Sequence, residues 1–265
     1  MHKTHLLQRC PIIAYHKISD KKEAGLTTVS PAVFEKQIRW LAEAGYETLT
    51  FKHLQRIVRL PEKSLIITFD DGYECIQRHA LPVLTAYGFT AVVYIITDYT
   101  GRTNTWEAVG WQQKHQHLDT RQIKEIHHLG FEIGSHGKTH RFLAALSDGE
   151  ILEEATQSRK YLEDLTGDEI ISFCYPYGRS TRRVRKLIGE SSYDWATGNL
   201  RLFGREQKDP LDLMRHSIYL SDSMGLFKEK IRRPLTFSSH TLQEILIQKG
   251  ALAGIAVNQL KKNQK

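Results

Sequence analysis

The feature that most constrains the fold is a regular alternation of short apolar runs with longer amphipathic segments. The apolar runs predict buried strands at residues 11–15, 64–69, 90–96, 131–135 and 170–174, with later strands at 194–197 and 215–220. The intervening segments predict helices at residues 31–44, 74–87, 119–129, 147–165 and 181–189. Because helices are the usual crossovers between parallel strands, we expect an α/β fold with a parallel sheet. Periodicity alone leaves open whether this sheet closes into a barrel.

The ends of two predicted helices carry specific signals. Ser30 is a good N-cap, Pro31 suits the first helical position, and Gly45 ends the same helix. Ser147 and Glu150 form a capping-box pattern at the start of another helix. These signals support the helix assignments independently of periodicity.

Length and composition fit one large α/β domain. The chain has 265 residues, and α/β barrels of about 250 residues are often single domains. It is 40% hydrophobic and 25% charged, which allows a sizeable core and does not indicate disorder. The three cysteines, Cys10, Cys75 and Cys174, are too scattered for a disulfide framework and fit a reducing compartment best.

The net charge of +7 describes a moderately basic chain. Such a surplus is usually a solvated surface, although it also favours contact with anionic membranes or polyanions. We find neither an RNP-like aromatic pattern nor zinc-finger spacing, so no nucleic-acid partner is expected. Residues 1–11 lack the apolar region of a secretory signal, and no run of about 18 apolar residues occurs. We therefore predict a cytoplasmic protein, with residues 245–260 as the candidate for peripheral membrane contact.

Polar clusters directly follow four of the predicted strands. These clusters are His16, Asp70-Asp71-Gly72, Ser135-His136 and Tyr175-Pro176-Tyr177-Gly178. In parallel α/β folds the carboxyl ends of the strands share one face, and sites are built there. The sequence therefore predicts that four distant segments converge at one site.

Adjacent acids and paired histidines at this face indicate metal chemistry. The neighbouring carboxylates of Asp70 and Asp71 repel each other unless one binds a cation while the other takes protons. The alternative interpretation of this acid pair is a helix start, where Asp is favoured by the helix dipole. His136 and His140 are four residues apart and can point the same way on one turn. Two imidazoles and a carboxylate are a common divalent-metal set that leaves positions open for water, whereas two unrelated surface histidines are the alternative.

These residues, in this order, resemble the NodB-type polysaccharide deacetylases of carbohydrate esterase family 4. The matching motifs are TFDDG at residues 68–72, SHGKTH at 135–140 and YPYG at 175–178. PIIAYHKIS at residues 11–19 is similar to the opening of the YH-containing branch, which includes the biofilm poly-N-acetylglucosamine deacetylases. The resemblance covers roughly residues 11–220. It implies an irregular (β/α) barrel of seven or eight strands, formed as one domain.

The resemblance also implies a division of the chain and roles for its residues. We expect an N-terminal extension at residues 1–10, a NodB-like deacetylase domain at 11–235 and a C-terminal helical tail at 236–265. Asp71, His136 and His140 match the metal triad, for which Zn²⁺ is favoured over Co²⁺ or Ni²⁺. Asp70 matches the catalytic base, and Tyr177 matches the residue whose backbone N–H helps to hold the oxyanion.

Further aromatic residues are candidates for substrate binding. Tyr175 and Pro176 belong to the same motif as Tyr177, and Trp106 lies in a polar loop after the strand at residues 90–96. Aromatic faces stack well on sugar rings, although an aromatic side chain in a loop is as often used for packing.

The sequence departs from the family pattern at two positions. The family commonly has an Arg, which orients the catalytic base, where this chain has Cys174. The late Leu-x-His motif that usually supplies the general acid is displaced by one residue and ends at His216. In the YH-containing branch the acid comes from the first strand, so we predict His16 as the acid and His216 as the second choice. A buried structural histidine is the alternative for His16.

The resulting prediction is a hydrolase that removes the N-acetyl group of an amino sugar in a polysaccharide or glycan precursor and releases acetate. The expected partner is therefore an N-acetylated glycan. One alternative keeps the site and changes the substrate to an O-acetyl sugar ester. Another is a non-catalytic carbohydrate-binding relative, against which the four intact residues Asp70, Asp71, His136 and His140 argue.

Overall fold

The computed structural model describes residue 7 and residues 10–21, 26–104, 114–199 and 209–232. Seven parallel strands close into a barrel: β1 (Ile12–Tyr15), β5 (Ser64–Phe69), β6 (Val92–Ile95), β7 (Glu132–Ser135), β8 (Ser172–Cys174), β9 (Trp195–Asn199) and β10 (Leu213–Ser217). Closure occurs at β1, which pairs with β5 on one side and with β10 on the other. The predicted (β/α) barrel is therefore confirmed.

Three short strands lie outside this ring. β4 (Glu47–Leu49) pairs with the amino-terminal half of β5, while β2 (Lys17–Ile18) and β3 (Thr28–Val29) form a separate two-stranded sheet. These strands have two or three residues each, which is too short for periodicity to identify them.

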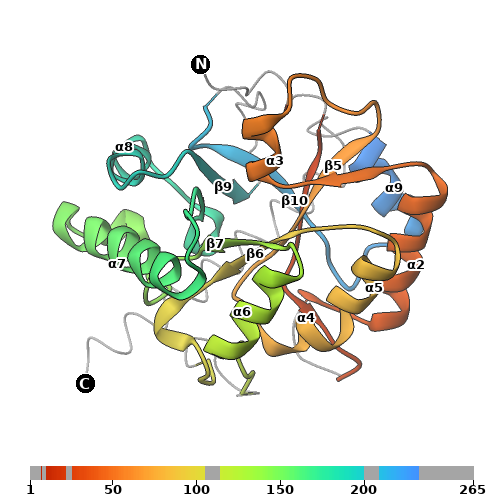
Figure 1. The fold of residues 1–265 in the computed structure, drawn as a ribbon, viewed down its shortest axis with the longest axis horizontal. Helices are drawn as coiled ribbons and strands as arrows, with labels where there is room; N and C mark the ends of the chain where they lie inside the picture. Colours follow the sequence, from red (N-terminus) through yellow and green to blue (C-terminus); the bar gives the residue numbers. More distant parts are fainter. Residues whose placement is uncertain (1–6, 8–9, 22–25, 105–113, 200–208, 233–265) are drawn as a thin grey trace.

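Helices surround the barrel (Figure 1). They are α2 (Pro31–Glu43), α3 (Phe51–Arg56), α4 (Glu74–His79), α5 (Leu81–Ala86), α6 (Thr120–His128), α7 (Asp148–Thr166), α8 (Arg182–Glu190) and α9 (Met224–Arg232). The predicted caps at Ser30 and Ser147 are confirmed, the latter with a complete capping box. The single helix predicted at residues 74–87 is wrong, because Pro82 lies in the first turn of α5 and cannot continue α4.

Two hydrophobic clusters lie on the two faces of the barrel sheet. The inner cluster includes Ile12, Ile66 and Val92, and the outer cluster, between strands and helices, includes the alternate residues Ile13 and Ile67. Successive side chains of a strand point to opposite faces. This alternation decides which polar residues near the strand ends face the barrel axis.

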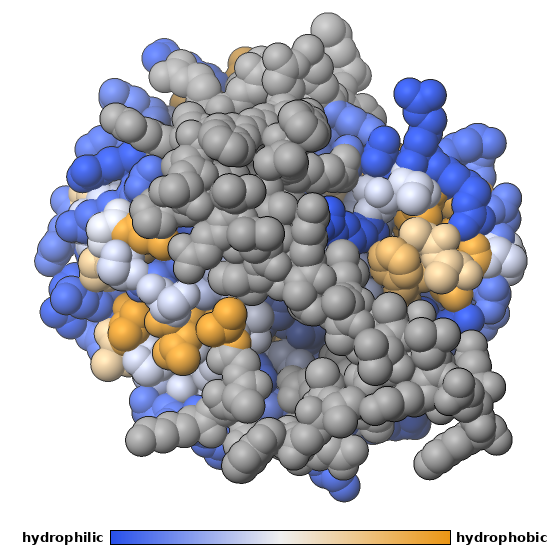
Figure 2. All heavy atoms as spheres, turned by 180° about the vertical axis from the view of Figure 1, so that it is seen from behind, coloured by the Kyte–Doolittle hydropathy of each residue, from blue (hydrophilic) through white to orange (hydrophobic). Residues whose placement is uncertain are grey.

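On the face seen in Figure 2, hydrophilic residues and apolar patches are both visible. None of the helices in the described ranges is both long and apolar enough to cross a bilayer. The expected tail at residues 236–265, its membrane-contact segment and most of the expected extension at residues 1–10 lie outside the described residues.

Glu132 is a buried carboxylate inside the amino-terminal end of the barrel. It accepts hydrogen bonds from the Lys52 backbone N–H and the Ser172 hydroxyl, both at 2.8 Å. Burial raises the pKa of Glu132 above its usual value, although the hydrogen bond from the Lys52 N–H opposes this. The protonated form is thus favoured in the folded state, so this side chain costs stability as the pH rises through its folded pKa.

We expect Glu132→Gln to be more stable than the wild type at neutral pH, with an advantage that shrinks as the pH falls from the raised folded pKa of Glu132 to the pKa of an unfolded Glu. Urea unfolding of both proteins between pH 4 and 8 measures this difference in the free energy of unfolding. The pKa of Glu in an unfolded chain is about 4.3. An advantage that grows towards acid pH would contradict the role of burial.

Candidate metal-binding and catalytic site

Three of the four predicted segments supply titratable side chains at the carboxyl end of the barrel strands, and the fourth, residues 175–178, follows β8 at the same end. His16 follows β1, Asp70 and Asp71 follow β5, and His136 follows β7. His140 lies at the end of the loop that begins at His136. Apart from His16, which is partly exposed, all of these side chains are buried.

Asp71, His136 and His140 form one compact cluster. The Asp71 Oδ1 atom lies 3.3 Å from His136 Nε2 and 3.4 Å from His140 Nε2. One ligand atom from each residue can be chosen so that all lie within 4.8 Å of one another. The three predicted metal ligands are therefore brought together in space.

The two imidazoles of the cluster differ in protonation. His136 Nδ1 lies 2.7 Å from the Cys174 carbonyl oxygen, which can only accept a hydrogen bond. The Nδ1 atom therefore carries a proton, and Nε2 is the atom that faces Asp71 and would bind a cation. Burial acts to lower the pKa of His136, but its contacts with Cys174 and Asp71 raise that pKa well above its usual value, so a cation bound at Nε2 would replace a proton there. Burial lowers the pKa of His140 to about 3, despite the opposing charge of Asp71, so its imidazole is neutral at neutral pH. A neutral imidazole nitrogen is the form that binds a divalent cation.

Asp71 itself lies in a tight turn with left-handed backbone. Its φ angle is 67° and that of Gly72 is 65°. The left-handed backbone at Gly72 favours glycine, and a Cβ atom there would lie 2.9 Å from the Ile95 Cδ1 atom, which would have to shift. The His117 Nδ1 atom lies 2.7 Å from the Asp71 carbonyl oxygen and fixes the turn from the other side. The turn aims the two neighbouring carboxylates in different directions.

Asp70 is held by a buried arginine from the last barrel strand. Arg215 Nη1 donates to Asp70 Oδ1 and Nη2 donates to Oδ2, both at 2.7 Å. Burial alone acts to raise the pKa of Asp70, but the charge and hydrogen bonds of Arg215 lower it below its usual value. Asp70 is therefore an ionised carboxylate beside the Asp71 cluster at neutral pH.

Cys174 occupies the position where the family commonly has its arginine, and Arg215 reaches that space from β10. Arg215 Nη2 lies 3.1 Å from Cys174 Sγ while it also binds Asp70. Sequence reasoning did not identify Arg215 as a functional residue. The available signal in the sequence was a charged residue, Arg215, within a predicted strand.

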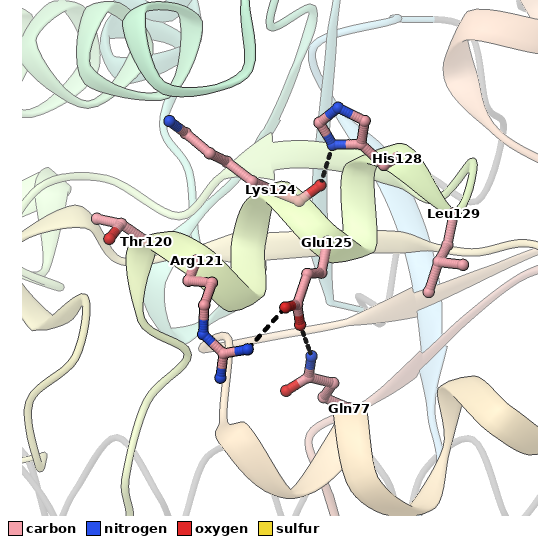
Figure 3. A pocket seen from close by; sticks show the side chains of 7 residues that line it. All are labelled: Gln77, Thr120, Arg121, Lys124, Glu125, His128 and Leu129. Carbon is pink, nitrogen blue, oxygen red and sulfur yellow. Dashed lines mark hydrogen bonds and ion pairs between the residues drawn. The ribbon is translucent and has the colours of Figure 1, made fainter.

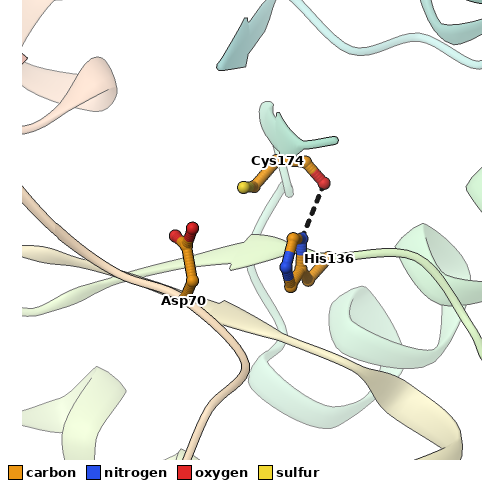
Figure 4. Close-up of side chains that lie close together, drawn as sticks. All are labelled: Asp70, His136 and Cys174. Atoms are coloured by element: carbon orange, nitrogen blue, oxygen red, sulfur yellow. Dashed lines mark hydrogen bonds between the residues drawn. The ribbon is translucent and has the colours of Figure 1, made fainter. Parts of the chain in front are cut away.

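The contacts of the Arg215 guanidinium distinguish two groups of residues that could each hold a metal ion. Asp70, His136 and Cys174 also lie close enough together to surround a cation, as Figure 4 shows. Both carboxylate oxygens of Asp70 and the sulfur of Cys174 are already bound by Arg215. Two of the three ligand groups are therefore already bound by the Arg215 guanidinium, and the Asp71 cluster is the candidate site for a metal ion.

The two candidates for the general acid differ in position. His16 Nε2 lies 3.9 Å from Asp70 Oδ2, at the edge of the site. Arg215 and His216 are successive residues of β10, so their side chains point to opposite faces of the strand. Since Arg215 points to Asp70, His216 points away from the barrel interior. The geometry favours His16, the first choice from sequence.

The YPYG motif forms a short turn, η3 (Pro176–Gly178), beside the metal cluster. Tyr177 has a left-handed backbone with φ of 59°, and its ring centroid lies 4.6 Å from that of His140. Tyr175 is fully buried and donates its hydroxyl to the Leu211 carbonyl oxygen at 2.7 Å. Pro176 is also buried, so Tyr177 is the member of this set that reaches the surface. Trp106 lies outside the described residues.

A surface pocket of about 720 Å³ lies elsewhere, along α6 (Figure 3). Its lining includes Gln77, Arg121 and Glu125, which are hydrogen-bonded to one another through Glu125. None of the residues of the Asp71 cluster lines it. We therefore assign it no part in the chemistry of the site.

The fold and the site define a (β/α) barrel protein with a candidate metal centre and an adjacent ionised carboxylate. The family model for polysaccharide deacetylases matches residues 58–196, which is more than half of the chain. The chain therefore belongs to the polysaccharide deacetylase family.

Individual relatives agree with this assignment. YxkH of Bacillus subtilis (strain 168), which carries the family's name, is 31% identical over 195 residues, covering 72% of this chain and 64% of YxkH. The poly-beta-1,6-N-acetyl-D-glucosamine N-deacetylase of Staphylococcus aureus (strain NCTC 8325 / PS 47) is 29% identical over 172 residues, covering 60% of this chain and 57% of that protein. The chain thus spans less than two thirds of either relative.

A solved structure shows the same architecture. BC0361, a polysaccharide deacetylase from Bacillus cereus, superposes with a TM-score of 0.71 at 28% identity. The match covers 84% of this chain and 68% of BC0361. It extends the similarity beyond the residues that the family model matches.

Proposed function

We propose that this protein is a metal-dependent hydrolase that removes the N-acetyl group from an amino sugar in a polysaccharide or glycan precursor and releases acetate. One observation carries the proposal: an ionised Asp70, fixed by Arg215, lies beside the cluster of Asp71, His136 and His140. The deacetylase domain is proposed to extend over residues 11–235. The name of the Staphylococcus aureus relative supports an N-acetylglucosamine polymer as the substrate class.

The residues that would hold the metal ion are Asp71, His136 and His140. Their set of two nitrogens and one oxygen suits Zn²⁺ best, with Co²⁺ or Ni²⁺ as alternatives. When bound, such an ion supplies Lewis acidity, which polarises an amide carbonyl and lowers the pKa of water.

The remaining steps are assigned to protein side chains. The Asp70 carboxylate accepts the proton of the attacking water, and Arg215 keeps that carboxylate oriented while it does so. The Tyr177 backbone N–H helps to hold the oxygen that gains negative charge. His16 donates a proton to the sugar nitrogen, so that a neutral amine leaves rather than an amide anion.

Substrate contacts are proposed at the rim of the site. Tyr177 is partly exposed next to His140 and can pack against a sugar ring. Tyr175 and Pro176 are proposed to act through the shape of the η3 turn. Trp106 stays a candidate from sequence for the same purpose.

Metal removal tests this proposal directly. We expect the purified protein to release acetate from short N-acetylglucosamine oligomers, and a chelator to lower that rate by about a hundredfold or more. Added Zn²⁺ should restore the rate in the wild type but not in His140→Ala, the matched control that lacks one ligand. Acetate release from O-acetyl sugars alone would support the ester alternative. Tight sugar binding without turnover of either substrate would support a non-catalytic relative.

A further inference from the structure

Glu154 is a buried carboxylate that the proposed chemistry does not use. It lies on α7 and is 4% exposed. Its Oε2 atom accepts hydrogen bonds from the backbone N–H groups of Lys138 and Thr139, each at 2.8 Å. Its Oε1 atom accepts a third hydrogen bond, from the Thr139 hydroxyl. All three donors belong to the loop that joins His136 to His140.

This loop has a backbone that needs outside support. It leaves β7 through Gly137, with φ of 78°, and ends at His140, with φ of 60°. A left-handed conformation is unfavourable for a residue with a side chain. His140 therefore keeps this conformation only if its surroundings impose it. A Cβ atom at Gly137 would lie 3.2 Å from Glu154 Oε2, so the loop lies close against the carboxylate.

Further hydrogen bonds of this loop join it to Ser135 and to the backbone of Thr97 and Asp98. The Gly137 N–H donates to the Ser135 hydroxyl at 3.1 Å, and that hydroxyl contacts Ser158 of α7 at 2.7 Å. The carbonyl oxygens of Gly137 and Lys138 accept hydrogen bonds from the backbone of Thr97 and Asp98. Among the described residues, Glu154 is thus the side chain that binds two successive N–H groups between the two imidazoles.

We propose that Glu154 is a positioning residue that presets the distance between His136 and His140, so that the metal ion binds to a site already formed. This inference rests on the proposed metal-dependent function. Groups that orient metal ligands typically change metal affinity by about 10- to 100-fold when removed. A carboxyl group is well suited to the task, because its two oxygens can accept several hydrogen bonds at once.

The neighbouring residue Glu153 provides a matched control. Its Oε1 atom accepts a hydrogen bond from the Lys138 side-chain Nζ at 2.8 Å, on the outside of the same helix. Its side chain is 52% exposed. Glu153 and Glu154 therefore contact the same loop residue, Glu153 through the Lys138 side chain and Glu154 through the Lys138 backbone N–H.

The test compares Zn²⁺ affinity of the full chain, by competition with a chromophoric chelator. Glu154→Leu keeps the volume and removes the acceptors, and we expect about 10- to 100-fold weaker binding. Glu154→Gln can still accept both N–H bonds and can donate to the Thr139 hydroxyl, so it should restore most of the affinity. Glu153→Leu should stay within about twofold of the wild type, because exposed ion pairs contribute little.

A second readout separates positioning from general stability. We expect the rise in melting temperature caused by Zn²⁺ to be smaller in Glu154→Leu than in the wild type, because ligand stabilisation depends on affinity. If Glu154→Leu lowers the melting temperatures with and without Zn²⁺ equally and keeps wild-type affinity, Glu154 is merely structural and the inference is overturned. Should Glu154→Leu fail to fold, Thr139→Val removes one of the three hydrogen bonds, and wild-type Zn²⁺ affinity there overturns it.

The outcome for the wild type distinguishes the two levels of the proposal. A wild-type chain that binds no Zn²⁺ overturns the metal-dependent function and this inference with it. A wild-type chain that binds Zn²⁺ and loses it in His140→Ala, but keeps it in Glu154→Leu, overturns the role of Glu154 alone.

Discussion

Replacing Asp70 with Asn is expected to lower the rate of acetate release by about 100- to 10,000-fold, the usual contribution of a general base. An amide has nearly the shape of a carboxylate but cannot accept the water proton. Since Asp71, His136 and His140 are untouched, the variant should still bind Zn²⁺. The measurement is kcat on N-acetylglucosamine oligomers, together with the zinc content of each purified variant.

The control for Asp70→Asn is Asp71→Asn, which changes the neighbouring carboxylate in the same turn. Asp71→Asn should lose both zinc and activity, whereas Asp70→Asn should lose activity alone. If Asp70→Asn keeps more than about a tenth of wild-type kcat, its effect is far below that of a general base, and another group takes the proton. Loss of zinc from both variants would show that the two carboxylates do not divide their roles as we propose.

Replacing Arg215 with Met is expected to have the largest effect on stability. Arg215 is fully buried and binds both oxygens of Asp70. Removing one partner of a buried ion pair leaves an uncompensated charge and typically costs about 3–5 kcal/mol. Urea unfolding of the two proteins measures this loss. The double variant Asp70→Asn/Arg215→Met should be more stable than Arg215→Met, because the unpaired carboxylate is then absent.

The pH dependence of activity tests whether Arg215 positions and charges the base. Burial acts to raise the pKa of Asp70, and Arg215 opposes it. Without the guanidinium the pKa of Asp70 rises, so the acidic limb of the pH–rate profile should move to higher pH in Arg215→Met. Arg215→Lys keeps the charge but loses the bidentate geometry, so its acidic limb should move less. An unchanged acidic limb in Arg215→Met would show that Arg215 supports the fold alone.

The parts of the site that could be predicted from sequence are those carried by contiguous motifs. Asp70 and Asp71 come from one motif, and His136 and His140 come from another. Each motif directly follows a predicted strand, and parallel strands bring their carboxyl ends together. Convergence of the metal cluster therefore followed from local patterns and one general property of parallel sheets.

The partner of Asp70 could not be found in the same way. Arg215 lies 145 residues from Asp70 and reaches it because β1 joins β5 to β10 when the barrel closes. No periodicity records which strands become neighbours across a closure. The substitution by Cys174 showed that an arginine was missing from its usual place, but only the packed barrel shows where its replacement comes from.

The sequence by itself determined the seven barrel strands and most of the helices between them, the caps of α2 and α7, and the motifs of the metal cluster. Those features depend on residues close together along the chain, whose spacing sets periodicity and hydrogen bonding within one turn. Only the tertiary structure decided barrel closure, the pairing of Asp70 with Arg215, the position of His16 beside Asp70, and the contact of Glu154 with the histidine loop. These depend on distances between segments far apart in sequence, which are set by packing of the whole barrel and not by any local pattern.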